Sequence, residues 1–259
     1  MSELDFNSLP DKIIVEHVSK HFRTDNRSMQ VLEDISLTVK VSEFVCLLGP
    51  SGCGKTTLLN LIAGFEFPEC GKIFVDGKIV KEPGSDRMVM FQESALFPWL
   101  DTMGNILFSL SLNRSLTPAE RKDKADYFIR LVGLEKFAHA FPHELSGGMK
   151  QRAALARALA PGPQVLLMDE PFAALDALTR EQLYEDLQLI RMNQEITIVF
   201  VTHNVAEAAC LGDRILLFSS NPGKIYKEFL VKLERPRDIR DLKVAQIAGE
   251  VTHHLRTYF

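Results

Sequence analysis

Short, largely apolar runs recur along the chain and predict buried strands. Phe44 to Leu48, Val165 to Met168 and Thr197 to Val201 form such runs, which are typical of parallel strands covered on both faces. Ile13 to Val18 and Ile35 to Val39 alternate roughly between apolar and polar residues, which predicts half-buried strands. Each run falls far short of the length that spans a bilayer.

Helical patterns occupy the stretches between these strands. Lys55 to Ala63 predicts a helix that ends at Gly64, and the pattern from about Met103 to Leu159 is helical. Within that stretch, Thr117-Pro118-Ala119-Glu120 is a good helix start, with threonine as the N-cap and glutamate closing a capping box. Strands and helices alternate again after Pro163.

The order of these elements predicts an α/β protein with a parallel sheet, interrupted by an all-helical insertion. We expect one domain. Within it, the α/β core is predicted at 1–92 and 160–235, the helical subdomain at 93–159, and a C-terminal tail at 236–259.

Composition excludes several classes of protein. The 259 residues are 46% hydrophobic and 25% charged, an ordinary balance for a globular protein with a sizeable core. The net charge of −4 gives no global attraction to nucleic acid, so no nucleic-acid partner is expected. The four cysteines include no CxxC pair, which argues against a zinc site, and the N-terminus lacks the apolar core of a signal peptide.

A glycine-rich loop that matches GxxxxGK[ST] follows the strand at 44–48. Glycines let the backbone wrap a phosphate without Cβ clashes, and the helix N-terminus points free N–H groups at the anion. Lys55 would reach the β- and γ-phosphates, and the Thr56 hydroxyl would bind Mg²⁺. The predicted ATP-binding residues here are Gly49, Pro50, Ser51, Gly52, Cys53, Gly54, Lys55, Thr56 and Thr57. We also expect the Cys53 thiol to be sensitive to alkylation and shielded by nucleotide.

Two adjacent acids, Asp169 and Glu170, follow the buried strand at 165–168. Ligands of open α/β sheets bind at the carboxyl edge of the strands. Because adjacent strand residues point in opposite directions, the two acids can do different work. Asp169 would hold the Mg²⁺ shell, and Glu170 would orient or deprotonate the attacking water.

The segment Leu145-Ser146-Gly147-Gly148-Met149, followed by Lys150-Gln151-Arg152, resembles the signature of ABC ATPases, which is usually LSGGQ. The chemistry is consistent, because a serine can cap a helix and the two glycines let the helix N-terminus approach a phosphate closely. The resemblance covers nearly the whole chain and implies a P-loop NTPase fold of the ABC ATPase type, with a parallel sheet, an N-terminal antiparallel β subdomain and an all-helical insertion.

Further positions resemble family motifs in the same order. Gln92 is similar to the Q-loop glutamine, which senses Mg²⁺ and water, and Ala174-Leu175-Asp176 is similar to the D-loop. His203 is similar to the switch histidine that contacts the γ-phosphate, and Phe22 occupies the position of the aromatic residue that stacks on adenine. Asp176 can equally be a plain helix N-cap, His203 a structural histidine, and Phe22 a core residue.

The resemblance implies a mechanism that needs a partner. In the family, two ATPase domains pair head to tail, ATP closes the pair and hydrolysis opens it. Ser146, Gly147, Gly148 and Asp176 would therefore bind ATP in trans, in a homodimer or a heterodimer with a homologue. Glu170, His203 and Gln92 would be catalytic, with Thr56, Gln92 and Asp169 around Mg²⁺.

The stretch from Asp86 to Leu100 is similar to the nitrate/sulfonate/taurine/bicarbonate importer branch. That resemblance implies an ATP-hydrolysing importer subunit at the cytoplasmic face of the plasma membrane. Its partners would be permease subunits and a periplasmic or lipid-anchored solute-binding protein. Phe97, Pro98 and Trp99 form an apolar knob that either lines the groove for a permease helix or tucks into the helical insertion.

Three alternatives stay open at this point. The chain could be the ATPase subunit of an ABC exporter or lipid-extraction system, or it could be a non-transport ABC ATPase. A binding module with dead catalysis is opposed by the presence of Lys55, Asp169, Glu170 and His203. The sequence of this chain does not indicate which solute is transported.

Overall fold

The computed structural model describes residues 9–24, 27–173, 175–220 and 222–258. The elements are, in chain order, β1 (Asp11–Thr24), β2 (Arg27–Lys40), β3 (Phe44–Leu48), α1 (Lys55–Ala63), β4 (Cys70–Val75), β5 (Lys78–Ile79), β6 (Arg87–Met90), α2 (Thr102–Ser111), α3 (Pro118–Leu131), the 3-10 turns η2 (Glu135–Phe137) and η3 (Pro142–Glu144), α4 (Gly147–Leu159), β7 (Val165–Asp169), α5 (Ala177–Asn193), β8 (Thr197–Thr202), α6 (Val205–Leu211), β9 (Arg214–Phe218), β10 (Ile225–Leu230) and α7 (Leu242–Tyr258).

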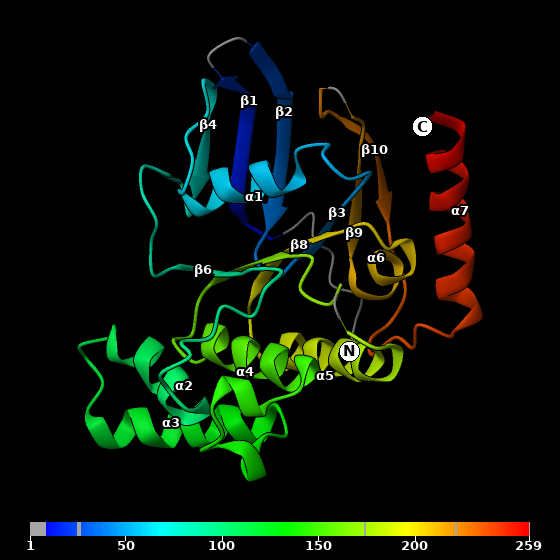
Figure 1. Ribbon diagram of the computed structural model, residues 1–259. Helices are drawn as coiled ribbons and strands as arrows, with labels where there is room; N and C mark the ends of the chain where they lie inside the picture. Colours follow the sequence, from blue (N-terminus) through cyan, green and yellow to red (C-terminus); the bar gives the residue numbers. More distant parts are fainter. Residues whose placement is uncertain (1–8, 25–26, 174, 221, 259) are drawn as a thin grey trace.

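Two sheets organise these elements (Figure 1). The larger has the order β10-β9-β3-β8-β7-β6, and its strands run parallel except β10, which pairs antiparallel with β9. The smaller has the order β2-β1-β4-β5 and is antiparallel. The expected α/β class, with its antiparallel β part and helical insertion, is confirmed.

The period-two pattern of strand residues assigns each side chain to one of two cores. Phe44, Cys46 and Leu48 of β3 join the core that packs under α4, α5 and α6. Their neighbours Val45 and Leu47 face the other way, into the core shared with α1 and the antiparallel sheet. The larger sheet is therefore covered on both faces, as its continuous apolar runs predict.

The first two strands are longer than the sequence pattern indicates. The alternation breaks because the β1–β2 pairing contains register shifts around Val15, Val18 and Lys20. His17 and Asp34 have positive φ angles of 49° and 50°, values that are typical of residues at irregular points of a ladder. The strands continue past these points, so Ile13–Val18 and Ile35–Val39 mark only their most regular parts.

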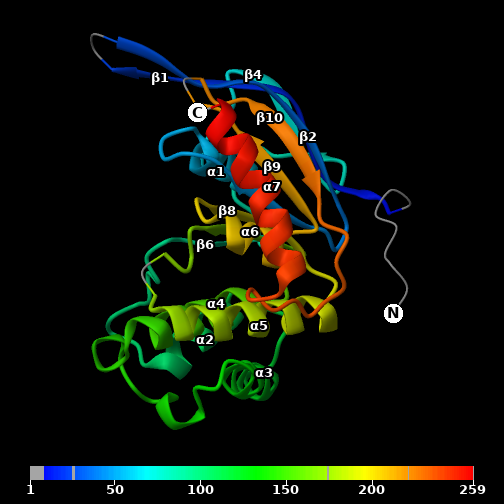
Figure 2. The same ribbon diagram turned by 90° about the vertical axis from the view of Figure 1, so that its right-hand side faces the viewer.

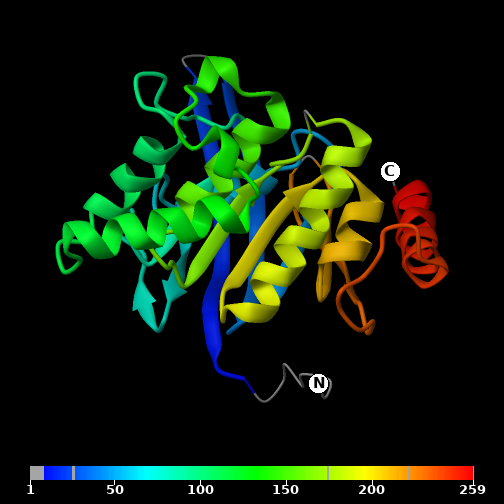
Figure 3. The same ribbon diagram turned by 90° about the horizontal axis from the view of Figure 1, so that it is seen from below.

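The helical segment lies below the larger sheet in Figure 1 and to one side of the molecule in Figure 3. The predicted helix start at Thr117 is confirmed with its full capping box. Thr117 Oγ1 accepts from the Glu120 N–H, and the Glu120 carboxylate accepts from the Thr117 N–H. Helices α2, α3 and α4 pack on one another, and α4 also contacts β6.

The C-terminal part adds an edge strand, β10, that the sequence analysis missed. Helix α7 then runs beside α6 (Figure 2), and His254 of α7 contacts the ring of Phe229 on β10. Arg237, which is 5% exposed, anchors the connection between them. Its guanidinium donates to the carbonyls of Val231, Leu233 and Gly212. Burial lowers the pKa of Arg237 to about 10, so it stays charged at neutral pH. Across the described ranges, helices that combine the length and apolar character of a bilayer span are absent.

Candidate functional site

The glycine-rich loop connects the buried strand β3 to α1, at the carboxyl edge of the larger sheet. Gly52 and Gly54 have φ angles of 79° and 93°, a region that favours glycine. At Gly54 space is also limiting, because a Cβ would lie 2.6 Å from Leu32 Cδ2. The loop therefore depends on β2, which supplies Leu32, as well as on β3 and α1.

Lys55 opens α1 and is held inside the loop. Its side chain is buried, and Nζ donates to the carbonyls of Gly49 and Pro50 at 2.8 and 2.9 Å. The ammonium therefore sits within the curve of the backbone that precedes it. A positive charge enclosed by a loop that ends at a helix N-terminus is suited to an anionic ligand.

Cys53 belongs to the same loop, but its thiol faces the protein interior. The residue is 1% exposed and packs in the core shared by α1, β1 and β2. The expectation of an alkylation-sensitive thiol is therefore wrong for this loop conformation. Cys53 can meet a ligand only through its backbone.

Thr56 and Asp169 come together from α1 and the end of β7. The Thr56 hydroxyl donates to Asp169 Oδ1 at 3.0 Å. Burial raises the pKa of Asp169, and the nearby Glu170 raises it further, while the hydrogen bond from Thr56 lowers it. A hydroxyl beside a carboxylate fits Mg²⁺, which takes oxygen ligands and usually completes its shell with waters and substrate phosphates.

Glu170 turns away from Asp169 and faces the end of β8. His203 Nδ1 lies 2.9 Å from Glu170 Oε2. Glu170 has a φ of 43°, an uncommon value for a non-glycine residue that recurs where a side chain must be aimed. Asp169 thus contacts Thr56, and Glu170 contacts His203. Both pairs lie at the edge of the sheet where β3, β7 and β8 end.

Gln92 follows β6 at the same edge, because β6 pairs parallel with β7 and Met90 lies opposite Met168. The hydrogen bond found at Gln92 is made by its backbone carbonyl, which accepts from Gln151 Nε2 of α4 at 2.8 Å. This bond links the segment after β6 to the helical segment.

Phe22 lies on the antiparallel sheet with 40% of its surface exposed. Lys20 Nζ lies 5.3 Å from the centre of its ring. Phe22 pairs with Met29 in the β1–β2 ladder, and the nearby Val31 of β2 borders Gly54 of the phosphate loop. The ring is thus an exposed aromatic surface rather than a core residue.

The other candidate residues lie on the opposite face of the larger sheet. Ser146 caps α4, its Oγ accepting from the Met149 N–H at 3.3 Å. Asp176 caps α5, and the hydrogen bonds it accepts from Thr179 lower its pKa. Helix α4 packs in the core on one face of the sheet and α1 in the core on the other (Figures 1 and 2). Ala174 lies outside the described residues.

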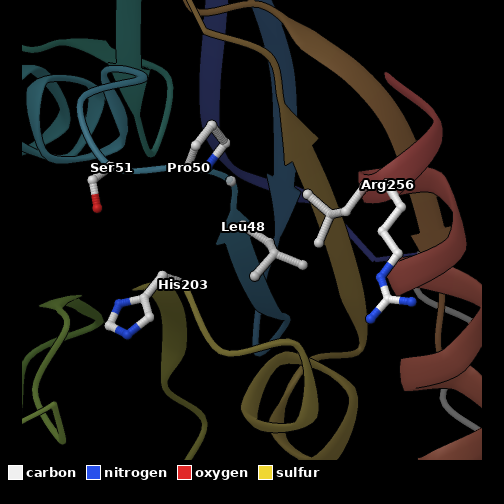
Figure 4. A pocket seen from close by; sticks show the side chains of 7 residues that line it. Leu48, Pro50, Ser51, His203 and Arg256 are labelled. Atoms are coloured by element: carbon white, nitrogen blue, oxygen red, sulfur yellow. The ribbon is translucent and has the colours of Figure 1, made fainter. Parts of the chain in front are cut away.

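A hollow of about 450 Å³ adjoins the phosphate loop on the side of α7. It is lined by Leu48, Gly49, Pro50, Ser51, His203, Leu255 and Arg256. Figure 4 shows Arg256 on the opposite side of the hollow from His203. Leu255 and Arg256 could not be predicted from the sequence, because no motif connects a C-terminal helix to the phosphate loop.

The sheet order, the phosphate loop on a helix N-terminus and the acids after β7 define a P-loop nucleoside triphosphate-binding protein. The model of the ABC transporter family matches residues 32–173. The nitrate import ATP-binding protein of Synechococcus elongatus is 41% identical over 93% of this chain and 90% of its own length. The aliphatic sulfonates import ATP-binding protein of Bacillus cereus is 44% identical over 87% of this chain and 88% of its own.

A solved structure agrees with these matches. The dimeric post-hydrolysis state of an ATP-binding cassette bound to ADP and Pi superposes with a TM-score of 0.76 and 29% identity, over 86% of this chain and 100% of that one. The chain belongs to the ABC transporter family. The ATP-binding proteins of ABC transporters hydrolyse ATP to power transport.

Gly148 provides a test of how α4 meets α5. A Cβ at Gly148 would lie 2.3 Å from Thr179 Cγ2, whereas one at Gly147 would meet nothing within 4 Å. We expect Gly148→Ala to lower the free energy of unfolding by about 1–3 kcal/mol, the usual cost of overpacking. Thr179→Ser removes the methyl group and should restore most of the loss, as measured by chemical denaturation.

Gly147→Ala is the matched control and should change stability by no more than about 0.5 kcal/mol. Equal losses at 147 and 148, or no recovery with Thr179→Ser, would contradict the close contact.

Asp169 allows a second test, on charge. Because its folded-state pKa is raised, the ionised carboxylate opposes folding above that pKa, and the cost disappears as the pH falls below it. Asp169→Asn can still accept from Thr56 and stays neutral. In a thermal melt at neutral pH without nucleotide, we expect this variant to be at least as stable as the wild type. Its advantage should shrink on acidification. A clearly lower melting temperature at neutral pH would show that burial of the charge is not the dominant effect.

Proposed function

We propose that this chain is the ATP-binding and ATP-hydrolysing subunit of an ABC importer. The observation that carries the proposal is the meeting of three pieces of chemistry at one sheet edge. They are the enclosed Lys55 ammonium, the Thr56–Asp169 pair and the Glu170–His203 pair. Together they supply phosphate binding, a metal site and a base next to a second polar group.

In this proposal the phosphate loop from Gly49 to Thr57 binds the ATP phosphates, and Phe22 stacks on adenine. Thr56 and Asp169, together with Gln92, would hold Mg²⁺, which would neutralise charge on the phosphates. Glu170 accepts the proton of the attacking water, and His203 contacts the γ-phosphate. The 2.9 Å contact between Glu170 and His203 supports a shared position next to the terminal phosphate.

A second ATPase subunit is needed because Ser146, Gly147, Gly148 and Asp176 lie away from the phosphate loop of their own chain. The solved cassette bound to ADP and Pi is dimeric. We infer a head-to-tail pair, either of two copies or with a homologue, in which these residues complete the partner's site. The proposed subdivision places the core at 1–92 and 160–235, the helical subdomain at 93–159 and the tail at 236–259.

The relatives favour import over the exporter, lipid-extraction and non-transport alternatives. The nitrate and sulfonate proteins match across most of both chains, so the likeness is not confined to the ATPase motifs. We infer that the cargo is a small solute such as nitrate, a sulfonate, taurine or bicarbonate. The subunit would then act on the cytoplasmic face of the plasma membrane with permease subunits and a periplasmic or lipid-anchored solute-binding protein.

The permease is proposed to dock on the aromatic knob after Gln92. Phe97 is half-buried, since its ring contacts Phe108 and its backbone bonds Asn105. Trp99 is 72% exposed and leans on Phe97 with ring centres 5.5 Å apart. Within the knob, Phe97 therefore packs against the helical segment, whereas Trp99 remains exposed and accessible to a partner. A docking surface needs this combination of a fixed base and an exposed aromatic side chain.

Replacing Glu170 tests the catalytic assignment. Glu170→Gln keeps the size of the side chain but removes the base, so we expect hydrolysis to fall by about 10²–10⁴-fold while ATP binding persists. The variant should accumulate a closed dimer with ATP, which size-exclusion chromatography with MgATP would detect. Hydrolysis at the wild-type rate would overturn the assignment of the base.

Replacing Trp99 tests the docking assignment. Trp99→Ala should weaken copurification of the permease and lower transport, with ATP binding by the isolated subunit unchanged, because a large exposed aromatic side chain is lost. Leu230→Ala is the control, since Leu230 is also exposed (60%) but lies on the edge strand β10. Normal permease assembly with Trp99→Ala would remove this residue from the interface.

A further inference from the structure

Glu207 is a carboxylate buried next to the proposed catalytic pair. It lies on α6 and is 5% exposed. A carboxylate removed from water requires donors, and Glu207 receives two hydroxyl groups. The Tyr184 hydroxyl on α5 donates to Oε1 at 2.6 Å, and the Thr202 hydroxyl at the end of β8 donates to Oε2.

Tyr184 is suited to donate. It is 2% exposed, and burial together with the charge of Glu207 raises the pKa of its phenol. Tyr184 therefore stays protonated at every physiological pH, and its hydroxyl hydrogen points at Glu207. This bond joins α5 to α6, which pack side by side.

Thr202 transmits the position of Glu207 to His203. The Thr202 hydroxyl accepts from the backbone N–H of Asn204 at 2.9 Å while it donates to Glu207. The bond from Asn204 closes a turn around His203, and the bond to Glu207 ties that turn to α6. The histidine's own side chain is 56% exposed, so little packing holds the ring, and its position depends on this backbone turn and on the contact with Glu170.

Arg180 connects the same carboxylate to the segment before α5. Arg180 Nε lies 4.0 Å from Glu207 Oε1, and Nη2 donates to the carbonyl of Leu175 at 2.6 Å. Leu175 immediately precedes Asp176, which is proposed to meet the partner subunit. A polar cavity of about 40 Å³ lies between these groups, with Glu170, Arg180, Thr202, His203 and Glu207 among its lining residues.

We propose that Glu207 is a positioning residue that holds the Thr202–Asn204 turn, and with it His203, in register with Glu170. Arg180 lies between Glu207 and the segment that ends at Asp176, and its cation balances the charge of the carboxylate. The inference rests on the proposed roles of His203 and Glu170 in ATP hydrolysis, and it adds a residue that touches neither nucleotide nor metal.

The chemistry of the network explains why a carboxylate is required. Both oxygens of Glu207 accept from hydroxyl donors, and a cation lies nearby. A glutamine of the same shape has one acceptor oxygen and an amide that donates. Its NH₂ group would face either Tyr184 or Thr202, so one hydroxyl would have to turn and the turn around His203 would loosen.

The test uses the full chain with Glu207→Gln and, separately, Tyr184→Phe. We expect kcat for ATP hydrolysis to fall about ten-fold with KM for ATP unchanged within about two-fold, since a small misplacement of a catalytic group lowers turnover. Gln188→Met is the control, because Gln188 is another buried polar residue of α5 that bonds Arg237 instead. It should lower the melting temperature and leave kcat unchanged.

A structural role is separated from a positioning role by repeating each substitution in a His203→Ala background. If Glu207 acts through His203, Glu207→Gln lowers kcat in the wild type and has no further effect when His203 is absent. A loss of the same factor in both backgrounds would overturn the proposal.

The second readout does not depend on activity. The ring nitrogen NMR signals of His203 at fixed pH should change with Glu207→Gln and Tyr184→Phe but not with Gln188→Met; unchanged signals would refute the proposal. Failure of the proposed function would appear separately, as wild-type protein that does not hydrolyse ATP or as His203→Ala that hydrolyses it normally.

Discussion

The candidate site depends on the parallel alignment of β3, β8 and β7. Their carboxyl ends meet at one edge, which places the phosphate loop, His203 and the two acids within reach of one another. Burial on both faces fixes this alignment, because a shift by one residue would exchange the side chains of the two cores. Polar groups then appear only where each strand leaves the sheet. The apolar strands and the charged site are thus two results of the same packing constraint.

Much of this arrangement could be predicted from the sequence. The strands at 44–48, 165–168 and 197–201 were recognisable because continuous apolar runs of this length are typical of strands buried on both faces, and the capping box at Thr117 is a local signal. The long β1 and β2 were underestimated, since the bulges near Val18 interrupt their alternation. Strand β10 is a short edge strand whose mixed pattern resembles a loop, and the inward direction of the Cys53 thiol follows from packing against β1 and β2.

Other parts of the site were beyond sequence reasoning because they arise between distant segments. Nothing in the sequence spacing indicates that Tyr184 and Thr202 both donate to the Glu207 carboxylate. Arg256 reaches the hollow by the phosphate loop only because α7 runs beside α6. The motif residues share another property. Burial disfavours the ionised form of Asp169 and raises its pKa, and Glu170 has an uncommon positive φ angle. Local preferences are overridden where the chemistry is concentrated.

The contact between Gly148 and Thr179 has a mechanical consequence. A missing side chain on α4 lets the β-branched residue of α5 approach its backbone, and this occurs in the first turn of both helices. The start of α4 is therefore packed closely against the start of α5, which Asp176 caps. The cap of α4 at Ser146 and the cap of α5 at Asp176 therefore belong to one closely packed unit, held together by the absence of a side chain at Gly148.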